Sequence, residues 1–199
     1  MAAAQCAGEA VYVEACEHYQ KQSWRNRFRY LSPDGPADLN FPVVHENGTF
    51  SLPIRAIRVD WSTPWAVRTK RSLEAAYGSS AFFEYYRDGL FDIYDSRPET
   101  LWELNSRLTL WLLGKLGIPA TILETAEWCP PGSDEYGEDL REAIHPKRPN
   151  SILRDLGLGK PYFQVFSGKY GFTDNLSVVD LLFNEGPNAL SYIRSAIRG

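Results

Sequence analysis

The sequence of 199 residues has few of the residues that build metal centres or disulfide frameworks. It contains three histidines and three cysteines, and no spacing of histidines places two of them on one face of an element. The cysteines Cys6, Cys16 and Cys129 are odd in number and have no metal-like spacing. We therefore expect ordinary thiols in a reducing compartment, and no metal site.

Long hydrophobic runs are also missing, which excludes a membrane-spanning helix. The first residues have neither the basic n-region nor the apolar h-region of a secretory signal. A glycine-rich phosphate loop is absent, and no motif indicates a bound cofactor. We therefore expect a cytoplasmic protein with no cofactor and no membrane span.

An excess of positive charge is absent from the chain as a whole, since its formal net charge is -4 and its isoelectric point is near 5.4. This balance argues against a general nucleic-acid-binding protein. The stretch from Glu17 to Leu31 departs from it, because Lys21, Arg25, Arg27 and Arg29 fall within nine residues that contain no acid. The local sign predicts a small anionic partner.

The spacing of the arginines suggests a common direction for their side chains. If Trp24 to Leu31 is extended, the period of two puts the arginines on one face and mostly aromatic side chains on the other. The planar guanidinium can bind a carboxylate or a phosphate through two hydrogen bonds. The alternative is an edge strand that outward-facing charges keep soluble.

Hydrophobic periodicity and turn residues predict an α/β protein, with a mixed sheet, a β-hairpin and flanking helices in a single domain of residues 1–199. The hairpin would run from Trp24 to Val44 around a turn at Pro33 to Pro36. The other expected strands are Ala10 to Cys16, Phe50 to Asp60, Pro119 to Ala126 and Pro161 to Phe166. A helical crossover makes Pro119 to Ala126 a parallel partner of Phe50 to Asp60.

Capping residues divide the middle of the chain into three helices. Thr63 caps the first at Pro64, Ser80 caps the second, and Ser96 with Glu99 forms a capping box for the third. Their expected core-facing residues are Leu73, Ala76, Tyr77, Phe82, Tyr86, Leu90, Ile93, Leu101, Leu104, Leu108, Trp111 and Leu112.

The last third of the chain carries two further expectations. The polar segment Cys129 to Asn150 is interpreted as a surface connection with one short helix at Glu138 to Ile144, and a lid over a site is the alternative. Ser177 and Asp180 form a capping pair for a helix that Gly186 ends. Asp180 therefore has a structural role available without catalysis.

Four blocks, in order, resemble the WbqC-like protein family in the form found in Bacteroidetes: EHYQKQSWRNRFRYL, AAYGSSAFFEYYRD, REAIHPK, and PYFQVF followed by GFTDNLSVVDLLFNEGPNAL. The resemblance runs from about Glu9 to Leu190. It implies a place in O-antigen and surface-polysaccharide gene clusters, and a suggested transfer of glycine or another aminoacyl group to an amino sugar.

The resemblance also implies site candidates at the positions that match the family pattern, which are Glu17, Lys21, Arg25, Asn26, Arg27, Tyr162, Gln164, Ser177, Asp180, Asn184 and Gly186. The sequence departs from the family in two ways. It lacks the proline-rich strand and helix with which members usually begin, and Thr69 stands where they tend to have histidine. The second departure argues against a mechanism that uses a histidine there.

Acyl transfer to an amine needs a base, donors to the oxyanion and anchors for phosphate. The expected catalytic residues are Glu17 and Asp180, and the expected substrate-binding residues are Lys21, Arg25, Asn26, Arg27, Tyr162 and Gln164. The expected ligand is a sugar nucleotide or an activated acyl donor. The alternative is a non-catalytic binding or scaffold protein whose partners are glycan-pathway enzymes, and a nucleic-acid module ranks last. The enzyme hypothesis requires the arginines and the C-terminal polar groups to meet in space.

Overall fold

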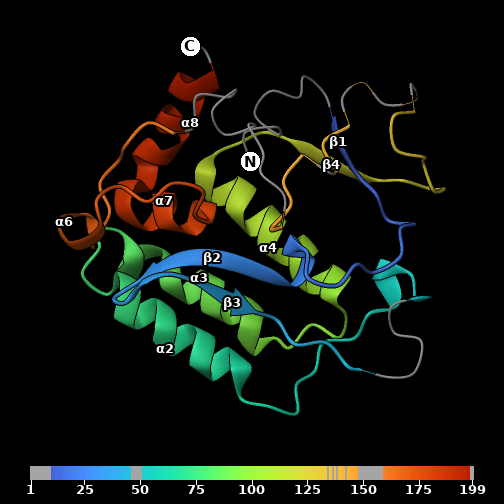
Figure 1. The fold of residues 1–199 in the computed structure, drawn as a ribbon, viewed down its shortest axis with the longest axis horizontal. Helices are drawn as coiled ribbons and strands as arrows, with labels where there is room; N and C mark the ends of the chain where they lie inside the picture. The colour runs from blue at the N-terminus through green and yellow to red at the C-terminus, as the bar shows by residue number, and fades with distance from the viewer. Residues whose placement is uncertain are drawn as a thin grey trace.

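A computed structural model gives the fold for residues 10–45, 51–133, 135, 137, 139–141, 143–147 and 159–197. It is of the mixed α/β class, with a β-hairpin and flanking helices as predicted (Figure 1). Its pairings form two separate two-stranded sheets in the described part of the chain, one parallel and one antiparallel. No helix there is long and apolar enough to cross a membrane.

Three consecutive helices form the main helical layer: α2 (Trp65–Tyr77), α3 (Phe83–Asp95) and α4 (Leu101–Leu116). The predicted apolar stripes are largely confirmed, since Leu73, Leu90, Leu101 and Leu104 are all at most 1% exposed. Burial of each such leucine contributes about 1.5–3 kcal/mol relative to an exposed position. The three helices therefore contribute a large part of the hydrophobic core.

The predicted caps of these helices are wrong in detail. Thr100, rather than Ser96, caps α4 by accepting the Glu103 amide at 3.1 Å, and the Glu103 carboxylate accepts the Glu99 amide. Both positions fit the capping-box pattern, but Pro98 disfavours helical backbone in the residue before it, Arg97, whose φ is 47°. The expected caps Thr63 and Ser80 are also not used, because α2 and α3 begin after Pro64 and Phe82 without a side-chain cap.

The predicted hairpin is confirmed as β2 (Arg27–Ser32) and β3 (Gly35–Asn40), which pair antiparallel. Gly35 has a φ of 109°, which explains the glycine at the end of the turn. The strand starts later than expected, because Trp24–Asn26 forms the 3₁₀ helix η1. Arg25 therefore lies outside the strand face that Arg27 and Arg29 share.

The parallel sheet pairs the first described strand with a strand from the middle of the chain. β1 (Ala10–Val13) pairs with β4 (Thr121–Glu124), and Ala10 lies opposite Thr121. The predicted partner of β4 is therefore wrong. The described part of the Phe50 to Asp60 segment forms the 3₁₀ helix η3 (Ile54–Ala56) and isolated bridges, because Ile54 and Ile57, three residues apart, are both buried. Phe50 lies outside the described residues.

The C-terminal elements are α6 (Ser167–Tyr170), α7 (Val178–Glu185), η4 (Gly186–Asn188) and α8 (Ala189–Ile197), which lie above the hairpin in Figure 1. The predicted strand Pro161 to Phe166 is wrong. The Gln164 side chain instead bonds both ways with the Thr173 backbone, at 2.8 and 2.9 Å, and replaces a strand ladder. The helix predicted at Glu138 to Ile144 is wrong for the residues described there, which form turns and bends.

The polar segment after β4 is attached to β1 through Glu14, which is 7% exposed. Its carboxylate accepts the Cys129 amide at 3.0 Å and pairs with Arg141 at 3.3 Å. Burial raises the pKa of Glu14, but hydrogen bonds from Thr125 and from backbone amides, together with the Arg141 charge, outweigh it and leave the pKa below its ordinary value. This anchor supports a fixed connection for the described residues.

Gly186 ends α7 with a φ of 53°, and a Cβ there would lie 2.5 Å from the Phe82 ring. We expect Gly186→Ala to lower the free energy of unfolding by about 3 kcal/mol, because backbone strain and the clash add. Gly168→Ala is the control, since a Cβ there meets nothing within 4 Å. Urea unfolding measures both variants, and an equally small effect for both would contradict the packing described here.

Candidate functional site

The predicted anion-binding residue Arg25 is bound to the predicted base Glu17. Two hydrogen bonds of 2.5 Å join its guanidinium to both carboxylate oxygens. The side chains are 19% and 18% exposed, so the pair is partly shielded from water. Asn105 of α4 holds the backbone carbonyl of Arg25 at 2.7 Å. The pair is a preformed unit at the entrance to the hairpin, and each partner neutralises the other.

The two strand arginines share one acid. Arg29 donates to Asp38 at 2.9 Å, and Arg27 lies 4.0 Å from the same carboxylate while it donates to the Ser23 carbonyl. Both guanidinium groups also lie over the Trp24 ring, with Arg27 at 5.9 Å and Arg29 at 5.2 Å from its centroid. The predicted common face of Arg27 and Arg29 is confirmed, but Asp38 occupies it too.

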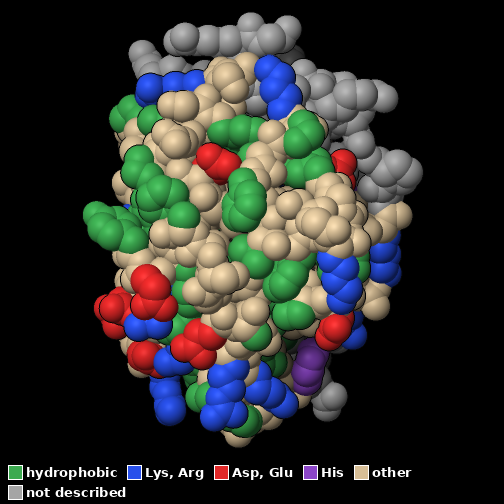
Figure 2. Space-filling view, turned by 90° about the vertical axis from the view of Figure 1, so that its left-hand side faces the viewer, with side chains coloured by type: hydrophobic (Ala, Val, Ile, Leu, Met, Phe, Trp, Pro, Cys, Tyr) green, Lys and Arg blue, Asp and Glu red, His purple; other side chains and the backbone are tan. Residues whose placement is uncertain are grey.

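The remaining N-terminal candidates have structural contacts or lie at the surface. Asn26 donates from its side-chain amide to the Phe41 carbonyl at 3.1 Å. Lys21 is exposed and lies in the turn before η1, next to Gln22, whose side chain contacts Lys147. On the face that Figure 2 shows, lysine and arginine side chains lie beside aspartate and glutamate in the lower part of the view. A continuous basic surface is not seen on that face.

The C-terminal candidates converge on Asp180, which α7 buries to 1% exposure. The Tyr77 hydroxyl of α2 donates to one carboxylate oxygen at 2.8 Å, and the Tyr162 hydroxyl donates to the other at 2.7 Å. The Gln164 amide lies 3.4 Å from the second oxygen, and the Asn184 amide holds the Asp180 backbone carbonyl at 2.8 Å. We call these five residues the Asp180 cluster.

The predicted capping pair is wrong. Ser177 occupies the N-cap position of α7 but supplies no side-chain cap. The backbone amide of Asp180 donates to the Ser177 carbonyl at 2.9 Å, and the Asp180 carboxylate points instead to the two tyrosines. A buried carboxylate requires hydrogen-bond donors more strongly than an exposed helix start requires a cap.

Burial sets the protonation of the Asp180 cluster. It raises the pKa of Asp180, and the hydrogen bonds from Tyr162, Tyr77, Gln164 and Asn184 offset this only in part. Burial and the neighbouring carboxylate also raise the pKa of Tyr77 and of Tyr162. Both tyrosines are therefore neutral donors at physiological pH, and Asp180 holds a proton more readily than an exposed aspartate.

One polar atom of the Asp180 cluster lacks a partner. The side-chain oxygen of Asn184 is buried, and no donor to it is found among the described residues. The buried indole nitrogen of Trp24, near the arginines, also lacks a hydrogen-bond partner among the described residues. A buried polar atom without a hydrogen bond costs about 1–3 kcal/mol. A hydrogen bond to either atom would be gained without loss of an existing one.

The arginines and the Asp180 cluster lie on elements that touch. The Ser177 amide donates to the Arg29 carbonyl at 2.8 Å, and the Leu31 amide donates to the Tyr77 hydroxyl at 3.3 Å. Strand β2 thus connects the two groups through its backbone. No hydrogen bond or ion pair joins the arginine side chains to the Asp180 carboxylate in the part of the chain that the structure describes. That part also contains no group of three potential metal ligands.

Sequence reasoning missed two residues of these groups. The periodicity places Tyr77 on the apolar side of its helix, and nothing in the local pattern marks its hydroxyl as a donor to a buried carboxylate. Asp38 carried a usable signal, because a turn centred on Pro33 and Asp34 pairs Arg29 with Asp38 across the hairpin.

The raised pKa of Asp180 predicts a pH dependence of stability. Between the ordinary pKa near 3.8 and the higher folded pKa, the unfolded chain has lost the proton that the folded chain keeps. We expect the free energy of unfolding of the wild type to fall, relative to Asp180→Asn, as the pH rises through this window, and then to level off. Urea titrations from acid to neutral pH measure the difference. Asp88→Asn, an exposed control, is expected to lack the trend; an equal trend in both would refute burial as the cause.

Comparison with known proteins gives the chain a family. The WbqC-like protein family matches residues 4–147. An uncharacterized protein of Mycobacterium tuberculosis, Rv1507c, is 29% identical over 199 aligned residues, which cover 88% of this chain and 84% of that protein. No solved structure shows a significant match. The matched region contains the hairpin, the helical layer and both strands of the parallel sheet. The chain therefore belongs to the WbqC-like protein family.

Proposed function

We propose that this protein is a transferase of surface-polysaccharide or O-antigen assembly, which moves an acyl or aminoacyl group onto the amine of a sugar. The observation that supports it best is the Asp180 cluster, in which a buried carboxylate with a raised pKa lies next to the unpaired Asn184 oxygen. An amine brings several N–H donors and needs such acceptors. Because its pKa is raised, this carboxylate is a stronger base than an exposed aspartate, which suits proton abstraction.

In this proposal Asp180 is the general base. The sugar amine attacks the acyl carbonyl, its proton passes to Asp180 directly or through the Tyr162 hydroxyl, and the leaving group departs. Gln164 is the proposed donor to the developing oxyanion. In the structure its amide donates to the Thr173 carbonyl at 2.8 Å and lies 3.4 Å from the Asp180 carboxylate. The longer and weaker of these two hydrogen bonds is the one that a substrate oxygen would replace.

Lys21, Arg25, Arg27 and Asn26 are the proposed binding site for an anionic donor or acceptor, such as a sugar nucleotide. Because Glu17 holds both ends of the Arg25 fork, an incoming phosphate competes with Glu17 for the guanidinium. Displacement of Arg25 would leave Glu17 as a second base. Phosphate binding and the release of Glu17 are then the same event.

The second candidate is a non-catalytic binding or scaffold protein of a glycan-assembly pathway. Its support is specific, because Arg25, Arg27 and Arg29 each already have an acidic neighbour within the chain. In that case the ion pairs fix the hairpin, and the Asp180 cluster fixes the C-terminal helices. Pull-down of a glycosyltransferase from the same pathway, without turnover of amino sugars, would favour this candidate.

Arg25→Ala tests the binding half of the proposal. We expect this variant to bind a UDP-linked amino sugar at least about tenfold more weakly than the wild type, because a charged hydrogen-bond donor contributes roughly 1.5–3 kcal/mol. Isothermal calorimetry measures the affinity, and circular dichroism checks the fold. Arg107→Ala is the matched control, since Arg107 forms a surface pair with Glu103. Unchanged binding in Arg25→Ala would remove this residue from the site.

Asp180→Asn tests the catalytic half. With a glycyl thioester as donor and a UDP-linked amino sugar as acceptor, we expect kcat to fall by about 10²–10⁴ because the base is lost, while the affinity for the sugar nucleotide is kept. Mass spectrometry of the acceptor detects the product. Full turnover by this variant would contradict the role of Asp180, and absence of turnover by the wild type would favour the scaffold candidate.

A further inference from the structure

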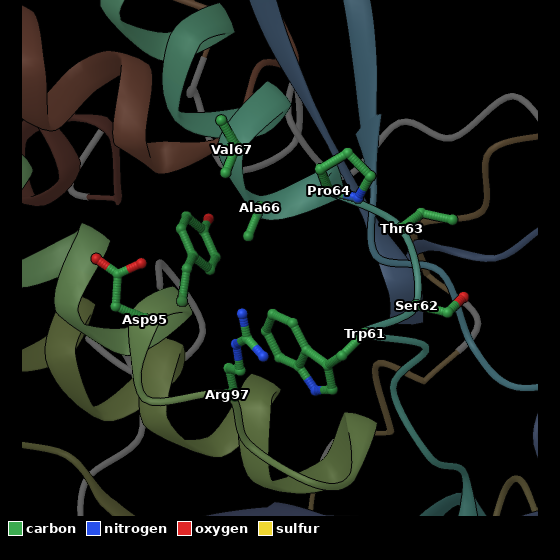
Figure 3. A pocket seen from close by; sticks show the side chains of 9 residues that line it. Trp61, Ser62, Thr63, Pro64, Ala66, Val67, Asp95 and Arg97 are labelled. Atoms are coloured by element: carbon green, nitrogen blue, oxygen red, sulfur yellow. The ribbon is translucent and has the colours of Figure 1, made fainter.

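A separate hollow of about 300 Å³ lies where the start of α2 meets the end of α3 (Figure 3). Its walls are formed by Trp61, Ser62, Thr63, Pro64, Ala66, Val67, Tyr94, Asp95 and Arg97. None of these residues belongs to the arginine group or to the Asp180 cluster. The volume is at the lower end of the range for small-molecule sites.

Trp61 provides a fixed flat wall. Its indole nitrogen donates to the Pro98 carbonyl at 2.9 Å, and its ring packs against Trp65 with centroids 4.7 Å apart. The side chain is half-buried, so part of the ring faces the hollow. An aromatic surface held on two sides is suited to stack against another ring.

Arg97 provides a positive charge that the protein does not neutralise. In contrast to Arg25, Arg27 and Arg29, its guanidinium has no hydrogen bond or ion pair with any residue that the structure describes. Its φ of 47° is in the left-handed region, where a residue other than glycine is strained. Figure 3 shows the guanidinium next to Trp61, directed into the hollow.

The start of α2 adds donors on the opposite wall. Pro64 occupies the N-cap position and supplies no side-chain cap, so the first amides of this 13-residue helix have no capping partner. The N-terminal end of a helix dipole favours an anion. Asp95 lies at the rim, but Lys70 pairs with it at 2.6 Å and removes most of its repulsion.

Tyr94 supplies a hydroxyl donor from a buried side chain. It is 1% exposed and lines the hollow, and its hydroxyl has no hydrogen bond to a described residue. Burial raises the pKa of Tyr94, so the hydroxyl stays protonated and can donate. The side chain is buried, but its hydroxyl oxygen is not one of the fully buried polar atoms that lack a partner, so a ligand in the hollow can reach it.

From this arrangement we infer that the hollow binds a small phosphate monoester that carries a flat ring. The ring stacks on Trp61, and the phosphate accepts hydrogen bonds from Arg97, the first amides of α2 and the Tyr94 hydroxyl. This site is independent of the proposed transferase chemistry, because it uses none of the same residues.

Phenyl phosphate is the probe for this site. We expect it to bind in a saturable manner and to shift the indole N–H signal of Trp61 in a nitrogen–proton correlation spectrum, which Trp61→Phe assigns. Phenol, which lacks the phosphate, and inorganic phosphate, which lacks the ring, should each bind at least about tenfold more weakly, since each loses one of the two contacts. No shift with phenyl phosphate, or equal binding of phenol, would overturn the inference.

Arg97→Gly is the decisive variant, because glycine tolerates the left-handed backbone and the fold should not be weakened by the change. We expect this variant to keep or raise its melting temperature and to bind phenyl phosphate about tenfold or more weakly. Arg87→Ala serves as the surface control and should bind as the wild type does, since Arg87 pairs with Glu84 and Asp88 and does not line the hollow. Equal affinity in Arg97→Gly and the wild type would show that the guanidinium is not part of a site.

Discussion

The buried carboxylate of Asp180 is the interaction on which the arrangement of the elements depends. A charge that is 1% exposed is stable only with hydrogen-bond donors, and these come from Tyr77 in α2 and Tyr162 in the segment before α6. Tyr77 also accepts the Leu31 amide of β2. The helical layer, the hairpin and the C-terminal helices therefore meet at one hydroxyl.

The arginines are stabilised differently, by ion pairs with acidic residues instead of by neutral hydrogen-bond donors. Their local excess of positive charge is met by Glu17 before η1 and by Asp38 across the hairpin, so the sign that looked unbalanced along the chain is balanced in space. An anion can enter only by competition with these acids. Arg97, which lies far from the basic stretch in sequence, has no such partner among the described residues. Charge patterning along the chain therefore pointed to the arginines that are already paired.

The sequence was sufficient where a local rule decides the structure. The hairpin followed from Pro33 and Gly35, and the core faces of α3 and α4 followed from the spacing of Leu90, Leu101 and Leu104. It was insufficient where a distant contact decides. The pairing of β1 with β4 depends on packing between segments far apart in the sequence. The Pro161 to Phe166 segment is set by the Gln164 side chain rather than by its β propensity. The donors of Asp180 come from 103 and 18 residues away, which no local pattern contains.

Asp180 is the group whose environment links the fold to the proposed chemistry. A carbon-13 NMR titration of its carboxyl carbon measures this environment directly. The predicted midpoint lies above 3.8, and it rises further in Tyr162→Phe, because that variant loses a hydrogen bond that stabilises the charged form. A midpoint at or below 3.8 in the wild type would contradict the account.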